Sequence, residues 1–347
     1  MDIINAIKVL TPAIASFCIG IAITPAITHY LYKYQCWKKQ AGNSRGIGDQ
    51  TGTPIFNELH KERDVNTPRM GGLVIVLSVI ATVVLFWVVS YLDSGGPSGK
   101  IDFLSRTQTW IPFATFVCGA LMGLIEDIAV IRTRDGIRFL YRLLPALGLG
   151  TIVAWWFYAK LGMTSILVPL LGSLTLGIWI IPFFLVVLLG VFASGVIDGL
   201  DGLSGGVLSI VFAAYGVIAL LQNQINLSAL CFVIVGAILA FLWFNIPPAR
   251  FYMTEVGFVA LALTLVVIAF MTGQVAVLPL IAFIQTITVI TNIIQVASKK
   301  LFGKKVFRVA PIHHHFEAIG WSAEKIVMRY WVVSVIAATL GVVLTLV

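Results

Sequence analysis

Long apolar runs recur along almost the whole chain and are separated by short polar segments. A helix needs about 20 predominantly apolar residues to cross the hydrocarbon core of a bilayer. We interpret ten runs as transmembrane helices: 7–32, 71–92, 109–126, 139–159, 178–197, 203–221, 227–245, 256–272, 275–296 and 328–347. The run from Ile166 to Leu176 is too short to span a membrane and contains Pro169 and Gly172, so we expect an external or re-entrant connection there.

The composition agrees with a membrane protein. The 347 residues are 59% hydrophobic and only 11% charged, whereas soluble globular domains carry about 25% charged residues. No long polar stretch interrupts the apolar runs, and the first run is too long for the apolar region of a signal peptide. The sequence therefore predicts an all-α, polytopic integral membrane protein that forms one domain over residues 1–347.

Lysine and arginine are distributed unequally between the two sides of this arrangement. Of the 23 basic residues, only Lys8, Lys100, Arg106 and Lys160 fall on the side that holds both termini, and the other nineteen fall on the opposite side. Cytoplasmic loops usually hold the excess of basic residues, so we predict that both termini lie outside. The net charge of +8 belongs mainly to the inner face, where anionic lipids, phosphates or nucleotides would be attracted. Nucleic acid is a poor alternative, because no basic helix or aromatic-interleaved patch extends far beyond the membrane.

Six acidic residues occur at the ends of predicted spans, all on the cytoplasmic side: Glu126, Asp127, Asp198, Asp201, Glu255 and Glu317. Charges near hydrocarbon are costly and often mark function. The adjacent Glu126 and Asp127 suit a divalent metal or a base with a raised pKa, although the arginines that follow could simply neutralise a solvated helix end. The convergence of four separate segments, more than any one residue, predicts an active site on the cytoplasmic face.

Asp198 and Asp201 lie three residues apart in the glycine-rich segment 198–206. In a helix, that spacing would place both carboxylates on one face, and the glycines would let a phosphate or a metal approach the backbone closely. A plain tight turn would explain the glycines. It would not explain two acids against hydrocarbon without a basic neighbour, so we favour a functional site.

Two further segments carry candidate ligands. Glu255 is the only acid between the seventh and eighth spans and could be an oxygen ligand for Mg²⁺, although the helix dipole also favours an acid at a helix N-terminus. His313, His314 and His315 are consecutive, so they cannot all face one way on a helix, and at least one could meet a substrate. Their spacing does not match the usual zinc sites. Contact with an anion or phosphate and a plain polar loop are the alternatives.

Five motifs occur along the chain in this order: Thr67-Pro68-Arg69-Met70-Gly71-Gly72, the segment 123–127, the segment 198–203, the segment 248–255 and Pro311-Ile312-His313-His314-His315-Phe316-Glu317. Together they closely resemble the motifs of the phospho-N-acetylmuramoyl-pentapeptide transferase family, a branch of the polyprenyl-phosphate N-acetylhexosamine-1-phosphate transferases. The aspartate motifs indicate only the superfamily, whereas the histidine string resembles this branch specifically. The similarity covers nearly the whole chain.

The resemblance implies Mg²⁺-dependent transfer of phospho-MurNAc-pentapeptide from UDP-MurNAc-pentapeptide to undecaprenyl phosphate, giving lipid I and UMP at the cytoplasmic face of the bacterial plasma membrane. The implied catalytic residues are Asp127 and Glu126, as activators of the lipid phosphate or nucleophile, with Asp198, Asp201 and His313. The implied metal ligands are Glu255 and Asp201. The candidate substrate contacts are His314, His315, Gly195, Arg138 and Lys61. The family also implies a homodimer.

Several motif positions differ from the family pattern. Glu126 and Glu255 stand where the family has aspartate, which keeps the charge but adds a methylene. Thr254 replaces glycine, Gly195 replaces asparagine and Arg69 replaces threonine. The alternatives are therefore a sister transferase for another UDP-N-acetylhexosamine, a catalytically silent paralogue and an ion-coupled transporter. The acids lie at span ends and no inverted repeat is apparent, which argues against the transporter.

Overall fold

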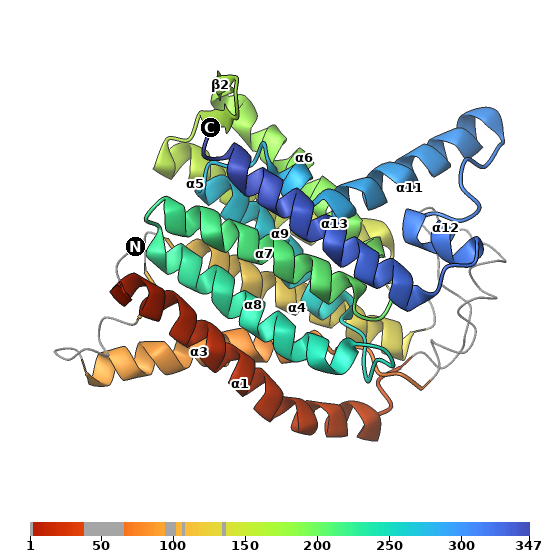
Figure 1. Ribbon diagram of the computed structural model, residues 1–347, viewed down its shortest axis with the longest axis horizontal. Coiled ribbons are helices and arrows are strands. Elements are labelled where there is room, and N and C mark those ends of the chain that lie inside the picture. Colours follow the sequence, from red (N-terminus) through yellow and green to blue (C-terminus); the bar gives the residue numbers. More distant parts are fainter. Residues whose placement is uncertain (1–2, 38–65, 94–101, 106–107, 134–136) are drawn as a thin grey trace.

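The computed structural model describes residues 3–37, 66–93, 102–105, 108–133 and 137–347, and most of these are helical (Figure 1). The elements are α1 (Ile3–Lys33), α3 (Leu73–Leu92), α4 (Trp110–Arg132), α5 (Phe139–Leu161), β1 (Ser165–Val168), β2 (Gly172–Thr175), η2 (Gly177–Trp179), α6 (Ile180–Ala193), η3 (Ser194–Ile197), α7 (Leu203–Leu221), α8 (Ile225–Asn245), α9 (Thr254–Met271), α10 (Leu278–Ile281), α11 (Phe283–Phe302), α12 (Ile312–Ala318) and α13 (Ala323–Leu344).

Within the described residues, nine helical segments are long and apolar enough to cross a membrane, and each corresponds to one of the ten predicted runs. The prediction of an all-α polytopic membrane protein is therefore confirmed. The remaining run, 275–296, is divided at Ala282 into the short α10 and the longer α11. Threonines and glutamines lower the hydropathy of α11, so it does not qualify as a span by composition. Both termini lie at the same end of the bundle (Figure 1).

Helix α9 occupies the centre of the bundle. It is apolar all round after its first turn, a pattern typical of a helix in the core of a large protein or inside a membrane. It packs along α4 and also contacts α3, α5, α6 and α7, and every residue from Val256 to Phe270 is buried. The outer helices α1, α3, α5 and α13 expose many apolar side chains, as helices that face lipid do.

Two glycine contacts allow this close packing around the start of α9. A Cβ on Gly123 of α4 would lie 2.1 Å from the carbonyl oxygen of Glu255, and a Cβ on Gly72 would lie 2.4 Å from Cα of Gly257. Larger side chains would push these backbones apart. The glycines therefore bring α4 and the beginning of α3 directly against the first turn of α9.

The segment from Ile166 to Leu176, predicted as a connection between spans, forms an antiparallel hairpin. Strands β1 and β2 pair with Ser165 opposite Thr175 and Val168 opposite Gly172. Gly172 has φ +85°, a conformation that glycine adopts without steric cost. The connection is thus a short ordered ribbon and not a span.

Candidate functional site

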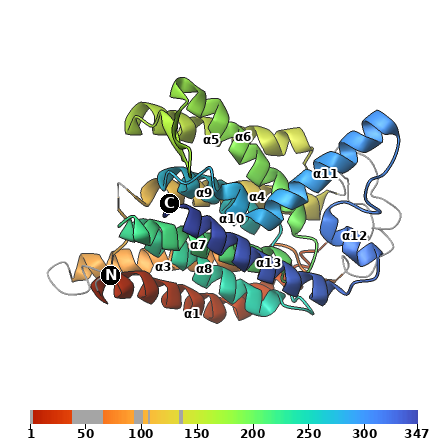
Figure 2. The ribbon, with the colours of Figure 1, turned by 45° about the horizontal axis from the view of Figure 1, so that its top comes forward.

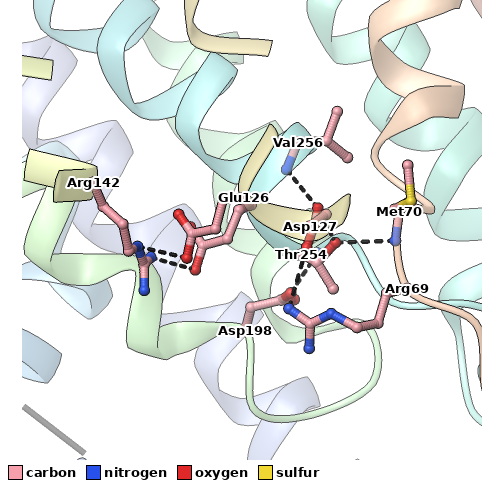
Figure 3. A network of polar contacts seen from close by, with 9 residues as sticks. Arg69, Met70, Glu126, Asp127, Arg142, Asp198, Thr254 and Val256 are labelled. Carbon is pink, nitrogen blue, oxygen red and sulfur yellow. Dashed lines mark hydrogen bonds and ion pairs between the residues drawn. The ribbon is translucent and has the colours of Figure 1, made fainter. Parts of the chain in front are cut away.

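Asp127 is the centre of a buried polar network near the C-terminal end of α4 (Figure 3). The sequence placed this residue at a helix end, but α4 continues to Arg132, so its carboxylate lies within the helix and is fully buried. Oδ1 of Asp127 lies 3.2 Å from Nη2 of Arg69. Oδ2 accepts hydrogen bonds from the Thr254 hydroxyl at 2.6 Å and from the Val256 backbone N–H at 2.9 Å. The network satisfies a carboxylate that burial would otherwise destabilise.

The segment before α3 reaches this network by pairing with the segment before α9. The N–H of Tyr252 donates to the carbonyl of Pro68, and the N–H of Gly71 donates to the carbonyl of Tyr252. The N–H of Met70 donates to the Thr254 hydroxyl at 3.0 Å. Met70 and Thr254 have φ values of +67° and +53°. Left-handed backbone is uncommon for such residues and often occurs at functional sites.

Arg142 connects two glutamates beside this network (Figure 3). Its Nε lies 2.5 Å from Oε1 of Glu126, and its Nη2 lies 2.6 Å from Oε1 of Glu255. The side chain of Glu126 is 7% exposed, and those of Arg142 and Glu255 are each 25% exposed. Close pairing with one guanidinium offsets the repulsion between two carboxylates that come from different helices.

Asp198 approaches the network from the loop that follows η3. Its Oδ2 accepts a hydrogen bond from the backbone N–H of Thr254 at 2.9 Å. Burial raises the pKa of Asp198 to about 6, while this hydrogen bond and the charge of Arg69 act in the opposite direction. A carboxyl group with such a pKa changes protonation near neutral pH, which suits proton transfer.

Asp201 belongs to the same loop but takes part in a separate set of contacts. Its Oδ2 accepts from the backbone N–H of Ala249 at 3.2 Å. The following Gly202 has φ +78°, donates its N–H to Oδ1 of Asn245 and accepts a hydrogen bond from Nε1 of Trp331. These bonds hold the glycine-rich loop against α8 and α13, so the loop has a defined shape.

The histidine string forms the short helix α12, which lies against this loop. His313 and His314 are buried, and their rings are 4.3 Å apart between centroids. A Cβ on Gly199 would lie 2.7 Å from Nε2 of His314, so two rings cover the backbone between the loop aspartates. Nδ1 of His314 lies 2.6 Å from Oε2 of Glu317. His315 accepts a hydrogen bond from a backbone N–H of the preceding loop.

Two of the other residues chosen from the sequence, Gly195 and Arg138, lie in the described part of the chain, and the carbonyl of Gly195 accepts a hydrogen bond from the Asp198 backbone N–H at 3.2 Å. Gly195 is in η3, where a Cβ would lie 3.0 Å from the ring of Phe258. Arg138 is exposed in front of α5, and Lys61 is outside the described residues. The roles predicted for these three residues, and for the other site residues, stay predictions.

Sequence reasoning did not select Arg69, Arg142 or Thr254, which complete the network. Arg142 lies within the predicted span 139–159, and a charged residue inside an apolar run was an available signal. Arg69 and Thr254 were visible as departures from a family pattern. Their partner, Asp127, could not be read from spacing because 58 and 127 residues separate them from it.

The net charge of the network would attract a cation. When ionised, Glu126, Asp127, Asp198 and Glu255 together exceed Arg69 and Arg142 by two negative charges. Within the described residues, no group of three or more Asp, Glu, His or Cys side chains is arranged to hold a metal ion by itself. Mg²⁺ commonly uses one or two carboxylates, with waters and substrate phosphates as its remaining ligands. The donor set and its excess charge therefore fit Mg²⁺ bound together with a phosphate substrate.

Comparison with known proteins places the chain among membrane transferases. The model of glycosyl transferase family 4 matches residues 109–273. Proteins named phospho-N-acetylmuramoyl-pentapeptide-transferase are similar over most of the chain. The one from Levilactobacillus brevis is 32% identical over 341 residues, covering 96% of this chain and 98% of that protein. Those from Geobacillus thermodenitrificans and Chloroflexus aggregans are 36% and 32% identical, covering 81% and 82% of this chain and 84% and 78% of those proteins.

Proposed function

Because the chain belongs to the phospho-N-acetylmuramoyl-pentapeptide-transferase family, we propose that it transfers phospho-MurNAc-pentapeptide from UDP-MurNAc-pentapeptide to undecaprenyl phosphate. The products are lipid I and UMP. As a member of this family, the chain is a phospho-sugar transferase of peptidoglycan synthesis and a multi-pass protein of the bacterial plasma membrane. This membership excludes the ion-coupled transporter as the main function. The homodimer stays a prediction.

The observation that carries the proposal is the convergence on Asp127 of segments far apart in the chain. Arg69 comes from the segment before α3, Asp127 from α4, and Thr254 from the first turn of α9. Asp198 joins them through the Thr254 backbone. Phosphoryl transfer depends mainly on positioning and on neutralising charge, and this cluster supplies carboxylates, guanidiniums and backbone donors in one buried place.

We assign the proton-accepting role to Asp198. In the reaction, an oxygen of the lipid phosphate forms a bond to the sugar-linked phosphorus, and the bond from that phosphorus to the UMP oxygen breaks. A lipid phosphate that still carries a proton transfers it to the Asp198 carboxylate, whose pKa of about 6 is suited to this exchange. Asp127 has both oxygens engaged by donors, so it positions Arg69 and Thr254 and does not attack.

We propose that the reaction requires Mg²⁺. Glu255 and Asp201 would hold the ion. The loop that carries Asp201 and Asp198 is hydrogen-bonded to the segment just before Glu255, through the N–H groups of Ala249 and Thr254. A bound Mg²⁺ supplies charge neutralisation at the pyrophosphate of the nucleotide substrate. His313 and His314, which cover Gly199, would contact substrate phosphate oxygens from the opposite side of the loop.

The test is lipid I formation by the purified full-length chain in detergent, from UDP-MurNAc-pentapeptide and undecaprenyl phosphate. UMP release is measured in parallel, with Mg²⁺ or with EDTA. Glu255→Gln and Asp198→Asn are compared with native protein. Glu324→Gln is the matched control, because Glu324 is also an acid in the first turn of a helix but is exposed and remote from the network.

We expect Mg²⁺-dependent product from native protein and from Glu324→Gln, and a loss of at least a hundredfold in the two site variants. Product formed equally well in EDTA would contradict the metal requirement but not the transfer. Turnover with UDP-GlcNAc and none with UDP-MurNAc-pentapeptide would replace the proposed substrate with that of a sister transferase.

A further inference from the structure

Helix α11 has its polar face inside the protein and its apolar face outside. Four of its five buried residues are polar, namely Gln285, Thr288, Thr291 and Gln295. Four of its exposed apolar residues form a stripe with helical spacing, namely Ile290, Ile293, Ile294 and Leu301. Figures 1 and 2 show α11 leaving the bundle at an angle, with its C-terminal half farthest from the other long helices. In water such a face would be unfavourable, so α11 presents it to the bilayer.

The C-terminal end of this helix combines apolar and basic side chains. We call residues 299–306, Lys-Lys-Leu-Phe-Gly-Lys-Lys-Val, the α11 tip. Leu301 and Phe302 are 72% and 73% exposed, and all four lysines of the tip are exposed too. No acidic residue occurs from Phe283 to Phe316. In the described part of the chain, no ion pair neutralises these lysines.

We propose that the α11 tip is a docking surface for the headgroups of anionic phospholipids. The apolar stripe continues into Leu301, which would insert beside the acyl chains at the membrane boundary together with its exposed neighbour Phe302. Lysine ammonium groups on flexible stems extend from such a boundary into the headgroup layer, where negatively charged phosphates are concentrated. The two lysines in the last turn, Lys299 and Lys300, also lie at the negative end of the helix dipole, which holds their charges beside the membrane surface.

The tip is tied to the histidine helix, so lipid contact there has a structural connection to the site. Oε1 of Gln295 accepts hydrogen bonds from the backbone N–H groups of Val306 and Phe307 at 3.1 and 2.9 Å, and its Nε2 donates to the carbonyl of Phe307 at 3.0 Å. The N–H of Arg308 donates to Nδ1 of His315 at 3.2 Å. Residues 306–308, which lead from the tip to α12, are therefore hydrogen-bonded both to Gln295 of α11 and to His315 of α12.

The test measures lipid binding and does not depend on the transferase activity. Purified full-length protein in neutral detergent is titrated with phosphatidylglycerol or phosphatidylcholine, and bound lipids are counted by mass spectrometry of the intact complex. The test variant is Lys299→Gln with Lys300→Gln. The matched control is Lys33→Gln with Lys160→Gln, which removes two exposed lysines from the last turns of α1 and α5.

Each lysine beside an anionic surface contributes about 1 kcal/mol, so the test variant should bind phosphatidylglycerol about thirtyfold more weakly than native protein. The control should bind it as native protein does, and phosphatidylcholine should bind weakly to all three. Equal binding of the two lipids, or unchanged affinity of the test variant, would overturn the proposal. Displacement of phosphatidylglycerol by millimolar inorganic phosphate or by UDP would also overturn it, because the lysines would then form a phosphate site for soluble ligands.

Discussion

The hydroxyl of Thr254 donates a 2.6 Å hydrogen bond to Oδ2 of Asp127 while it accepts a 3.0 Å hydrogen bond from the Met70 backbone N–H. One short side chain therefore connects the segments before α3 and α9 with the middle of the site. Thr254 has φ +53°, a conformation that costs an L residue about 1–2 kcal/mol. We infer that its two hydrogen bonds offset this cost, since both are buried.

Replacing Thr254 separates the backbone effect from the hydrogen bonds. Thr254→Ala loses both bonds and keeps the unfavourable conformation, whereas Thr254→Gly loses the bonds and removes the conformational cost. We expect Thr254→Ala to lower the free energy of unfolding by about 2–3 kcal/mol, and Thr254→Gly to be more stable than Thr254→Ala by about 1 kcal/mol. Unfolding in detergent followed by tryptophan fluorescence would measure both. Equal stability of the two variants would contradict the inferred strain.

Arg142 should be important for stability because it is the common partner of two glutamates. Arg142→Gln leaves Glu126 and Glu255 facing each other without a cation, and breaking a buried ion pair costs about 3 kcal/mol. Arg142→Lys should lose less, since it keeps the charge but not the planar pair of donors.

Arg138→Gln is the control for this prediction. It makes the same substitution one helical turn earlier at an exposed position, where changes usually remain within about 0.5 kcal/mol. Thermal unfolding of the three variants in one detergent would measure these effects. A larger loss of stability in Arg138→Gln than in Arg142→Gln would show that the ion pairs of Arg142 do not stabilise the protein as predicted.

The spans could be predicted because each depends on a local apolar run. The predicted run 203–221 coincides with α7, and 139–159 ends two residues before α5 does. The division of 275–296 at Ala282 was missed. The polar residues of α11 are accommodated because the protein covers that face of the helix, and a local apolar run does not reveal such coverage. The acid motifs were found by residue type. The pairing of Arg142 with Glu126 and Glu255 was not, since it arises from the packing of α4, α5 and α9 and leaves no signal in residue spacing.

Asp198 should make stability and activity respond in opposite directions to acid. Its folded-state pKa is raised from 3.8 to about 6, so between these values the folded protein binds more protons than the unfolded chain. The contribution of Asp198 to stability therefore decreases as pH rises from about 4 to 6, in total by about 3 kcal/mol, and is constant above. Activity should fall below pH 6, because the proton acceptor is then occupied.

The measurements for Asp198 are unfolding and UMP release between pH 5 and 8. Asp198→Asn should be more stable than native protein at pH 7.5, by an amount that shrinks toward pH 5, and should be inactive throughout. Asp93→Asn, at the C-terminal end of α3, is the control and should follow the native profile. A native activity that stays constant from pH 7 to pH 5 would exclude Asp198 as the proton acceptor.

Gly123 should tolerate no side chain, because α4 and α9 approach each other closely there. A Cβ would lie 2.1 Å from the Glu255 carbonyl oxygen and 2.6 Å from Cα of Val256, and both belong to backbone that cannot turn aside. Gly123→Ala must therefore move Asp127 away from the Val256 N–H, and a displacement near 1 Å can reduce the rate about a hundredfold. We expect that loss in UMP release, with a stability loss of about 3 kcal/mol.

Gly148→Ala is the matched control in the neighbouring helix α5, since nothing lies within 4 Å of the added Cβ. Alanine is the better helix former by about 1 kcal/mol, so this variant should be as stable as native protein or more so, with unchanged activity. If Gly123→Ala kept native activity, the first turn of α9 would have to be more adaptable than its burial indicates. Asp127 would then not depend on this helix contact for its position.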